Sequence, residues 1–243
     1  MLLKNQNIFV TGVGKGIGFD LVNEIVKEGG FVYGITRSKD DIKKISNKMS
    51  KIYCGDVTNV NLIKKIFNQS IKDKKIITGV VNNAAQRQRL KFEDIDLNKI
   101  KKLFDVNFFS IFQIMKIYYN YIKNKKTHSS IVNIGSIVGG LGFKDLSGYA
   151  STKTALIGLT KSFAVEMSKQ KIRANLINPG FVKTSYFNKF KKKKIYDWTL
   201  KRIPMNRWGS SNEISTVICF LLSNRSSYIN GQVINVDGGW TSS

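Results

Sequence analysis

Three residues, Ser136, Tyr149 and Lys153, have the types and the spacing needed to move a proton to or from an oxygen atom. Tyr149 and Lys153 lie four residues apart in a segment that predicts a helix, so their side chains share one face of it. An ammonium group beside a phenol favours the phenolate and lowers the pKa of the tyrosine. A serine hydroxyl held opposite can hydrogen-bond a substrate oxygen as charge develops on that oxygen. The combination predicts a proton-transfer site for an alcohol or a ketone, although the same tyrosine–lysine spacing also occurs in helices where both side chains only cover apolar surface.

The elements that would position these residues alternate between strands and helices. Ser136 follows an apolar strand at 130–135, and Tyr149 and Lys153 lie in the helix that comes next. Further strands are predicted at 8–11, 31–36, 51–54, 76–81, 172–178 and 232–236, with helical periodicity at 19–27, 59–71, 97–123 and 212–222. This order predicts an α/β, Rossmann-type fold: a doubly wound parallel sheet of seven strands with helices on both faces. Residues 1–243 show no linker and no repeat, so we expect a single domain.

A glycine-rich segment at 11–18, T-G-V-G-K-G-I-G, connects the first strand to the first helix. Glycines let the backbone approach a pyrophosphate, and the free N–H groups and the dipole of the following helix favour its negative charge. A glycine cluster alone can be merely a tight turn. Its place between a strand and a helix is the context that a dinucleotide site requires, so we interpret it as an anion cradle.

The end of the second strand indicates which dinucleotide is bound. It carries Arg37 and Ser38 where an NAD site usually has an acidic residue for the ribose 2′-hydroxyl. Arg37 would pair with a 2′-phosphate, and Lys15 in the glycine segment could reach the same group. Both could instead be ordinary surface cations of a lysine-rich chain, but their positions favour NADP(H) over NAD(H). Asp40 and Asp41 are interpreted as caps of the next helix.

Composition narrows the class of protein. Hydrophobic residues make up 42% of the chain, there are only 2 prolines, and no apolar run approaches the ~20 residues needed to span a bilayer. The N-terminus lacks the pattern of a signal peptide, so we expect a cytoplasmic protein without a membrane partner. Cys54 and Cys219 are isolated in apolar stretches and predict buried free thiols, and the single His128 gives no support for a metal site.

The net charge of +24, from 40 basic and 16 acidic residues, could indicate a polyanionic partner. Lysine, however, is spread through every segment, as a compositional bias would produce. The densest run, at 191–194, has no interleaved aromatic residues that could stack on bases. We therefore expect no specific nucleic-acid partner, only weak attraction to polyanions.

Taken in order, the motifs resemble those of the short-chain dehydrogenase/reductase family over essentially the whole chain. They are T-G-x-x-x-G-x-G at 11–18, Asp56, N-N-A at 82–84, Asn107, Ser136, Y-x-x-x-K at 149–153, P-G-x-V-x-T at 179–184 and the tail N-G-Q-V-I-N-V-D-G-G. The chain departs from the family pattern at Ala85, where glycine is more common, and at Ile134-Gly135, where a second serine is more common.

The resemblance implies a role for each matching residue. Tyr149 would be the general acid/base, Ser136 would polarise the carbonyl, and Lys153 would tune Tyr149 and bind the ribose. Asn107, at a kink in its helix, would hold a water of a proton relay. With Arg37 and Ser38 added, the expected cofactor contacts are Gly12, Lys15, Gly16, Ile17, Gly18, Arg37, Ser38, Asp56, Val57, Asn83, Ala84, Tyr149, Lys153, Pro179, Gly180, Val182 and Thr184. The cofactor would supply the hydride, and no metal is needed.

Two segments should form the mouth of the substrate pocket, Q-R-Q-R at 86–89 and the stretch 186–208. The region 197–209, D-W-T-L-K-R-I-P-M-N-R-W-G, together with 86–89, resembles family members that act on gluconate and related sugar acids. In that case Arg89 or Arg87 would pair with a carboxylate, and Ser136 and Tyr186 would also contact the substrate. Both arginines could equally lie on a solvated surface or at a subunit contact. The rest of the chain is similar to 3-oxoacyl-carrier-protein reductases, where a basic face would dock an acidic carrier protein.

The sequence thus predicts an NADP(H)-dependent oxidoreductase that interconverts a secondary alcohol and a ketone on a small molecule such as a sugar acid or polyol. One alternative is a 3-oxoacyl-carrier-protein reductase-like enzyme. Another is a nucleotide-sensing or nucleic-acid-binding protein without catalysis, which the full set of Asn107, Ser136, Tyr149 and Lys153 disfavours. The resemblance also implies a homotetramer, assembled through the helices after Asn98 and Ser147 and through the last helix and strand.

Overall fold

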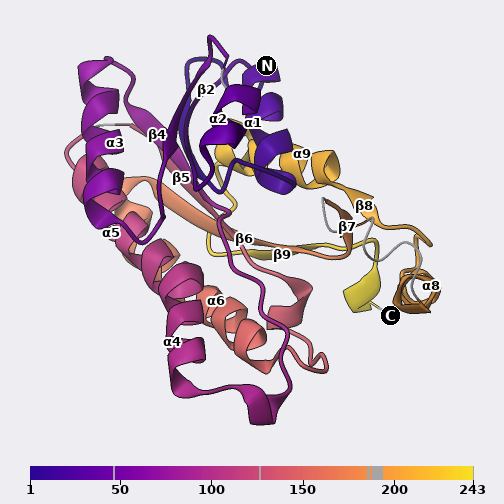
Figure 1. Cartoon of the computed structure of the whole chain (residues 1–243). Coiled ribbons are helices and arrows are strands. Elements are labelled where there is room, and N and C mark those ends of the chain that lie inside the picture. Colours follow the sequence, from indigo (N-terminus) through magenta and orange to yellow (C-terminus); the bar gives the residue numbers. More distant parts are fainter. Residues whose placement is uncertain (46, 126, 185–186, 188–193, 243) are drawn as a thin grey trace.

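The centre of the protein is a seven-stranded parallel sheet with strand order β3-β2-β1-β4-β5-β6-β9 (Figure 1). The computed structural model describes residues 1–45, 47–125, 127–184, 187 and 194–242. The strands are β1 (Asn7–Thr11), β2 (Phe31–Thr36), β3 (Ser50–Cys54), β4 (Ile77–Asn82), β5 (Ser129–Ile134), β6 (Ile172–Pro179) and β9 (Val233–Val236). The predicted doubly wound parallel sheet of seven strands is confirmed.

Helices cover both faces of this sheet, as Figure 1 shows. One face carries α1 (Ile17–Lys27), α2 (Lys39–Ile45) and α9 (Ser211–Leu222), and the other carries α3 (Val60–Lys72), α4 (Leu97–Phe104), α5 (Ser110–Ile122) and α6 (Ser147–Met167). Because successive side chains of a strand point to opposite faces, β1 contributes to two separate hydrophobic cores. Phe9 packs with Phe67 and Leu156 in one core, while Ile8 packs with Leu21 in the other.

A π-helical turn, η2 (Asp105–Phe109), interrupts what the sequence predicts as one helix at 97–123. The turn separates α4 from α5, and Asn107 is fully buried within it. Such turns are rare and occur most often at functional sites. At Asn107, where the sequence predicts a kink, the helix changes from α-helical to π-helical hydrogen bonding.

The sheet reverses its winding between β1 and β4, because the chain moves outward from β1 through β2 and β3 and then returns to β4. Ligands of open α/β sheets bind at such a point, beyond the carboxyl ends of the strands. Asn83, just after β4, ties the two strand ends together: its side-chain amide donates to the carbonyl oxygens of Thr11 and Gly12, both at 3.0 Å. These two hydrogen bonds fix the carboxyl ends of β1 and β4 relative to each other.

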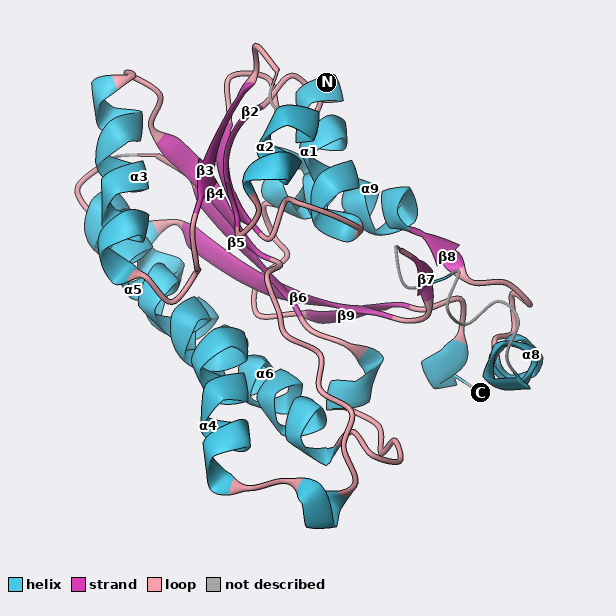
Figure 2. Ribbon diagram, viewed as in Figure 1, coloured by secondary structure: helices cyan, strands magenta, loops and turns pink. Residues whose placement is uncertain are grey.

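Short elements beyond β6 were not predicted from the sequence. A two-stranded parallel sheet pairs β7 (Val182–Lys183) with β8 (Gly209–Ser210), and α8 (Lys194–Arg202) lies near it (Figure 2). Two-residue strands leave no periodicity to detect. The 3₁₀ turns are η1 (Phe92–Asp94), η3 (Ile137–Gly139), η4 (Ser168–Gln170), η5 (Asn224–Ser226) and η6 (Trp240–Ser242).

The structure corrects one prediction about the cysteines. Cys219 is buried in α9, as expected, but Cys54 is exposed. Cys54 is the last residue of β3, an edge strand with pairing on one side only, so the apolar neighbours that suggested burial do not enclose its thiol. Within the described part of the chain, no helix has the length and apolarity needed to cross a membrane.

Candidate active site

Ser136, Tyr149 and Lys153 line one cavity of about 280 Å³ at the carboxyl edge of the sheet. Ser136 follows β5, and its backbone N–H donates to Asn178 Oδ1 of β6 at 2.9 Å. The Ser136 hydroxyl oxygen accepts from the backbone N–H of Val138 at 3.2 Å, so its own hydrogen is available to donate elsewhere. The three residues of the predicted proton-transfer site are therefore brought together.

Tyr149 and Ser136 line the same cavity, and the interaction between their side chains favours the Tyr149 phenolate. The pKa of Tyr149, however, differs from the expectation. Burial raises the pKa of Tyr149 above its ordinary value of 10.0, and the charge of Arg87 and the interaction with Ser136 offset this only in part. The expected lowering by Lys153 is wrong for this arrangement, because desolvation disfavours the phenolate more strongly than the neighbouring groups favour it.

Lys153 is buried, with 2% of its surface exposed, and its amine donates to the backbone oxygen of Ile134 at 2.6 Å. The Nζ atom lies 5.8 Å from the centre of the Tyr149 ring. Burial lowers the pKa of Lys153 to about 8, because a charged ammonium loses its hydration there. A lysine amine that changes charge close to neutral pH can take part in proton transfer.

Asn107 contacts the loop that follows β4 rather than Tyr149 or Lys153 directly. Its Oδ1 accepts from the backbone N–H of Gln86 at 2.7 Å, and its Nδ2 donates to the Gln86 backbone oxygen at 2.9 Å and to Thr152 Oγ1 at 3.1 Å. These bonds fix the start of the loop 86–90 against α6. The side chain of Asn107 thus positions this loop, and the water relay remains a prediction.

A second cavity, of about 620 Å³, lies over the glycine-rich segment. It shares Ile17, Asn83, Ala85 and Thr184 with the first cavity, so the two are adjacent. Of the predicted cofactor contacts, Gly12, Lys15, Gly16, Ile17, Arg37, Ser38, Asp56, Val57, Asn83, Ala84 and Thr184 line this second cavity. Tyr149, Lys153, Pro179, Gly180 and Val182 line the first one, together with Ile17, Asn83 and Thr184.

The glycines of this segment fit a bound dinucleotide for two different reasons. Gly12 and Gly16 have φ angles of 72° and 56°, which L side chains rarely adopt, and a Cβ on Gly12 would lie 2.8 Å from the Cα of Ala84. Gly18 lines neither cavity: a Cβ there would collide with the backbone oxygen of Gly12, so Gly18 allows α1 to pack closely on β1. The N-terminus of α1 has no side-chain cap, so no side chain occupies the place where a phosphate would meet the helix dipole.

The part of the second cavity next to the end of β2 contains both cations and a carboxylate. Lys15, Arg37 and Ser38 line it, as the NADP(H) prediction requires, but so does Asp41. Asp41 lies in the first turn of α2 and accepts from the Thr36 hydroxyl at 3.1 Å, and a Cβ on Gly14 would collide with it. The interpretation of Asp41 as a helix cap is therefore wrong, because its side chain turns back to the strand end.

Arg87 and Arg89, from the loop after β4, line the first cavity together with Tyr149. They differ in their partners: Arg89 Nε lies 3.7 Å from Asp145 Oδ2, whereas the charge of Arg87 acts on Tyr149. The two predicted anion-binding residues are thus at the catalytic cavity. Tyr186, the remaining predicted substrate contact, lies outside the described residues.

Apolar side chains also line this cavity; the predicted stretch 186–208 contributes two of them, and sequence reasoning missed the others. These side chains, which we call the aromatic wall, come from four separate segments: Ile137, Val138, Phe143, Leu146, Phe181, Ile195 and Trp208. Trp208 is the central one. Its indole is in ring contact with Phe181 and Tyr196, with centroids 5.3 and 5.4 Å away, and its Nε1 donates to Thr199 Oγ1 of α8 at 2.7 Å. The aromatic residues between 181 and 208 were the available signal, but their convergence depends on tertiary structure.

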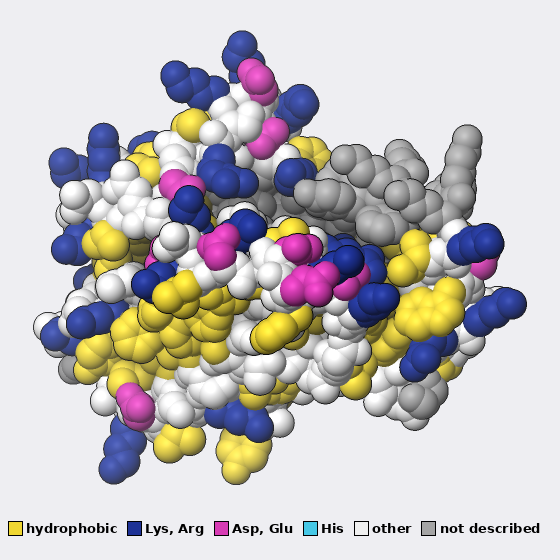
Figure 3. All heavy atoms as spheres, turned by 60° about the horizontal axis from the view of Figure 1, so that its bottom comes forward, with side chains coloured by type: hydrophobic (Ala, Val, Ile, Leu, Met, Phe, Trp, Pro, Cys, Tyr) yellow, Lys and Arg dark blue, Asp and Glu magenta, His cyan; other side chains and the backbone are white. Residues whose placement is uncertain are grey.

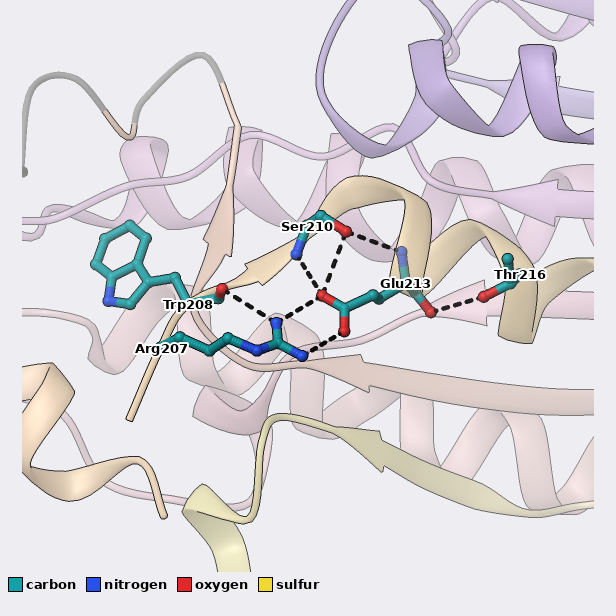
Figure 4. Close-up of polar contacts among 5 residues, drawn as sticks. All are labelled: Arg207, Trp208, Ser210, Glu213 and Thr216. Atoms are coloured by element: carbon teal, nitrogen blue, oxygen red, sulfur yellow. Dashed lines mark hydrogen bonds and ion pairs between the residues drawn. The ribbon is translucent and has the colours of Figure 1, made fainter. Parts of the chain in front are cut away.

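A charged clamp beside Trp208 fixes this wall to α9 (Figure 4). Both terminal nitrogens of Arg207 contact the carboxylate of Glu213, at 2.8 and 2.7 Å. Glu213 also accepts from the backbone N–H of Ser210 in a capping box at the start of α9. Hydrogen bonds to Arg207 and Ser210 lower the pKa of Glu213 to about 2. The clamp thus ties the backbone on both sides of Trp208 to the first turn of α9.

Comparison with known proteins agrees with this arrangement. The family model described as "Enoyl-(Acyl carrier protein) reductase" matches residues 12–241. The chain is 33% identical to a 3-oxoacyl-[acyl-carrier-protein] reductase of Thermotoga maritima, covering 98% of this chain and 99% of the relative. It is 31% identical to a 2-dehydro-3-deoxy-D-gluconate 5-dehydrogenase of Bacillus subtilis (99% and 96% covered) and 32% identical to carbonyl reductase [NADPH] 2 of Sus scrofa (96% of both).

Solved structures give the same result for the fold. A candidate gluconate dehydrogenase from Agrobacterium tumefaciens superposes with a TM-score of 0.92 at 25% identity, covering 99% of this chain and 98% of the other. These matches extend over the whole sheet and both cavities. The chain therefore belongs to the short-chain dehydrogenase/reductase family of NAD(P)-dependent oxidoreductases.

Proposed function

We propose that this protein interconverts a secondary alcohol and a ketone with NADP(H) as hydride carrier. The observation that carries the proposal is that Ser136, Tyr149 and Lys153 line one cavity, which is adjacent to the glycine-lined one. The bound dinucleotide would supply or accept the hydride at the substrate carbon. Tyr149 then gives its proton to the carbonyl oxygen during reduction and takes it back during oxidation, while Ser136 holds that oxygen.

The test of this function is a substrate screen with reduced and oxidised cofactor, followed by absorbance of the reduced nicotinamide. Tyr149→Phe keeps the ring and removes the proton donor, so turnover should fall at least 10²-fold while NADPH binding, followed by fluorescence, stays within a factor of two. Tyr228→Phe, at a fully exposed tyrosine, is the matched control and should leave turnover unchanged. Full activity of Tyr149→Phe would contradict the assignment of the acid/base.

Two cations support NADP(H) rather than NAD(H) in this proposal, since Lys15 and Arg37 line the part of the second cavity next to the end of β2. A 2′-phosphate is recognised well by such a pair. Parallel titrations of NADPH and NADH by fluorescence test the preference. Tighter binding of NADH would show instead that the Asp41 carboxylate, which would accept from a ribose hydroxyl, determines cofactor choice.

The substrate we propose is an anionic carbonyl compound. Arg87 and Arg89 line the catalytic cavity together with apolar and aromatic side chains. A sugar acid would use the arginines for its carboxylate, and relatives that act on gluconate derivatives support that class. The relatives that reduce 3-oxoacyl groups on a carrier protein support an alternative with a longer apolar body, for which the aromatic wall is suited. Comparing kcat/KM for 2-keto-gluconate derivatives and 3-oxoacyl thioesters separates the two.

We also propose a cytoplasmic homotetramer that binds no nucleic acid specifically. Apolar side chains remain exposed on the helical layer that contains α4 to α6, among them Leu97, Phe112 and Val165. Figure 3 shows hydrophobic side chains gathered over a broad area of one face, while Lys and Arg side chains are scattered over several parts of it. Light scattering after size exclusion measures the assembly. Salt-dependent DNA binding without carbonyl turnover would favour the non-catalytic alternative.

A further inference from the structure

The turn η6 near the end of the chain is held in place by the carboxylate of Asp237, the first residue after β9. One oxygen of Asp237 accepts from the backbone N–H of Gly239 at 3.0 Å, and the other accepts from the backbone N–H and the hydroxyl of Thr241, at 2.9 and 2.7 Å. Thr241 Oγ1 also accepts from the Asn235 amide at 2.9 Å. The residue between these bonds is Trp240, so its backbone is held on both sides.

Trp240 is buried, with 5% of its surface exposed, and packs in a cluster of aromatic side chains. Its ring stacks on Phe143, with centroids 6.1 Å apart and an interplanar angle of 22°, and its centroid lies 4.9 Å from that of Phe181. Trp198 of α8 lies 5.6 Å from Trp240, and the Arg202 guanidinium carbon lies 5.2 Å from the centres of both indoles. The end of the chain accordingly lies beside α8 (Figure 1).

Phe143 and Phe181 line the catalytic cavity, whereas Trp240 does not. Phe143 belongs to the segment that joins Ser136 to Tyr149, and Phe181 comes shortly after β6. Trp240 therefore contacts two rings of the aromatic wall without reaching the cavity itself. Because side chains in a protein interior are close-packed, a large ring in this position limits how far its neighbours can move away from the cavity.

We propose that Trp240 is a positioning residue for substrate choice, which supports Phe143 and Phe181 and so limits the length of apolar chain that the catalytic cavity accepts. This limit rests on the proposed function, whereas the contacts of Trp240 do not. A smaller side chain at position 240 leaves a void that neighbouring side chains partly fill. The two rings then move away from the cavity of about 280 Å³, which becomes larger on that side.

The first test observes the aromatic wall and needs no turnover. The chain contains three tryptophans, at 198, 208 and 240, so labelling with 5-fluorotryptophan gives three ¹⁹F NMR signals, and Trp208→Phe identifies the signal of Trp208. Trp208 lines the cavity, and its ring centroid lies 5.3 Å from that of Phe181. In Trp240→Leu the Trp208 signal should therefore shift by more than its linewidth. Trp240→Phe, which keeps a ring, should leave that signal in place.

Phe67→Leu is the matched control, because Phe67 is similarly buried but belongs to a different hydrophobic core and lines neither cavity. It should lower the thermal unfolding temperature and leave the Trp208 signal unchanged. An unchanged Trp208 signal in Trp240→Leu would overturn the proposal, and so would an equal shift in Phe67→Leu, which would indicate a general loosening. Circular dichroism checks folding, and Trp240→Met takes the place of Trp240→Leu in both tests if the latter does not fold.

The second test, which rests on the proposed function, compares the NADPH-dependent reduction of the 3-oxobutanoyl and 3-oxooctanoyl thioesters of N-acetylcysteamine. The measured quantity is the ratio of kcat/KM for the longer thioester to that for the shorter one, which does not depend on the amount of folded enzyme. In Trp240→Leu this ratio should rise about 10-fold over the wild type, the effect of burying roughly two further methylene groups. Trp240→Phe and Phe67→Leu should each leave the ratio unchanged.

A ratio that is unchanged or lower in Trp240→Leu would refute the limit on substrate length. Absence of turnover of both thioesters in the wild type would refute it as well, because the aromatic wall would then not face substrates of this class. In that case the NMR result on Trp208 still stands, and turnover of other carbonyl compounds decides separately on the proposed function.

Discussion

The buried Lys153 should make the stability of this protein depend on pH in a way that one substitution can isolate. Its pKa falls from 10.5 in the unfolded chain to about 8 in the folded protein because the ammonium is desolvated. Below pH 8 both states carry the proton, so the folded state bears the full cost of the buried charge. As pH rises from 8 to 10.5 the folded protein releases the proton first, and its stability increases until the unfolded chain is also neutral.

The shift of 2.5 units corresponds to about 3.4 kcal/mol at 1.36 kcal/mol per unit. Lys153→Met removes the titrating group, so the free energy of unfolding of the wild type, relative to the variant, should rise by about 3 kcal/mol between pH 7 and pH 10.5. Other titrations, including those of the tyrosines, are common to both proteins and cancel in this difference.

Urea unfolding followed by circular dichroism at half-unit pH steps measures the effect without any substrate. Lys161→Met, at an exposed lysine of the same helix, is the control and should show no pH-dependent difference from the wild type. A wild-type-minus-Lys153→Met difference that stays constant within about 0.5 kcal/mol would refute the reasoning. It would mean that the bond to the Ile134 oxygen compensates for the lost hydration at every pH.

Three further changes test other parts of the structure. Gly12→Ala should destabilise the protein by about 1–2 kcal/mol and abolish NADPH binding, because residue 12 has a positive φ and its Cβ would press on Ala84. Thermal unfolding measures the loss of stability, and a fluorescence titration measures the loss of NADPH binding. Asp41→Asn should tighten NADPH binding several-fold and leave NADH binding weaker or unchanged, since it removes a negative charge from the cavity that would hold the 2′-phosphate; equal gains for both cofactors would contradict this. A thiol reagent such as Ellman's should modify one cysteine rapidly, and Cys54→Ser should remove that phase, because Cys219 is buried and burial raises the pKa of its thiol.

The sheet and the cofactor side of the site were largely predictable because both depend on local patterns. Buried parallel strands appear as short apolar runs, and each is followed by the residues that lie at its carboxyl end. Once the strands are recognised as parallel, the glycine segment, Arg37, Asp56 and Asn83 must meet at one edge, and they line a single cavity. In a parallel sheet the residues that follow each strand lie at the same edge, so their place in the fold can be inferred from their place in the sequence.

Features that depend on side-chain direction could not be predicted in the same way. Cys54 ends an edge strand, so its apolar neighbours do not bury it. Asp41 has the position of a residue in a first helical turn, but its carboxylate bonds to Thr36 and reaches the cofactor cavity. The pKa of Tyr149 depends on a balance between burial and charges from another loop, which spacing along a helix does not contain.

The cofactor half and the substrate half of the site are built from different kinds of structural element, and this difference affects which residues can determine the substrate. The cofactor half lies on strand ends that are fixed by the parallel sheet. The substrate half combines a braced arginine loop with an aromatic wall whose centre, Trp208, is held by Thr199 on one side and by the Arg207–Glu213 clamp on the other. Substitutions in this wall can therefore change the body of the substrate without disturbing the Ser136–Tyr149 pair. Arg87 and Arg89, by contrast, line the same cavity as Ser136 and Tyr149, so changes in these arginines lie closer to the proposed acid/base.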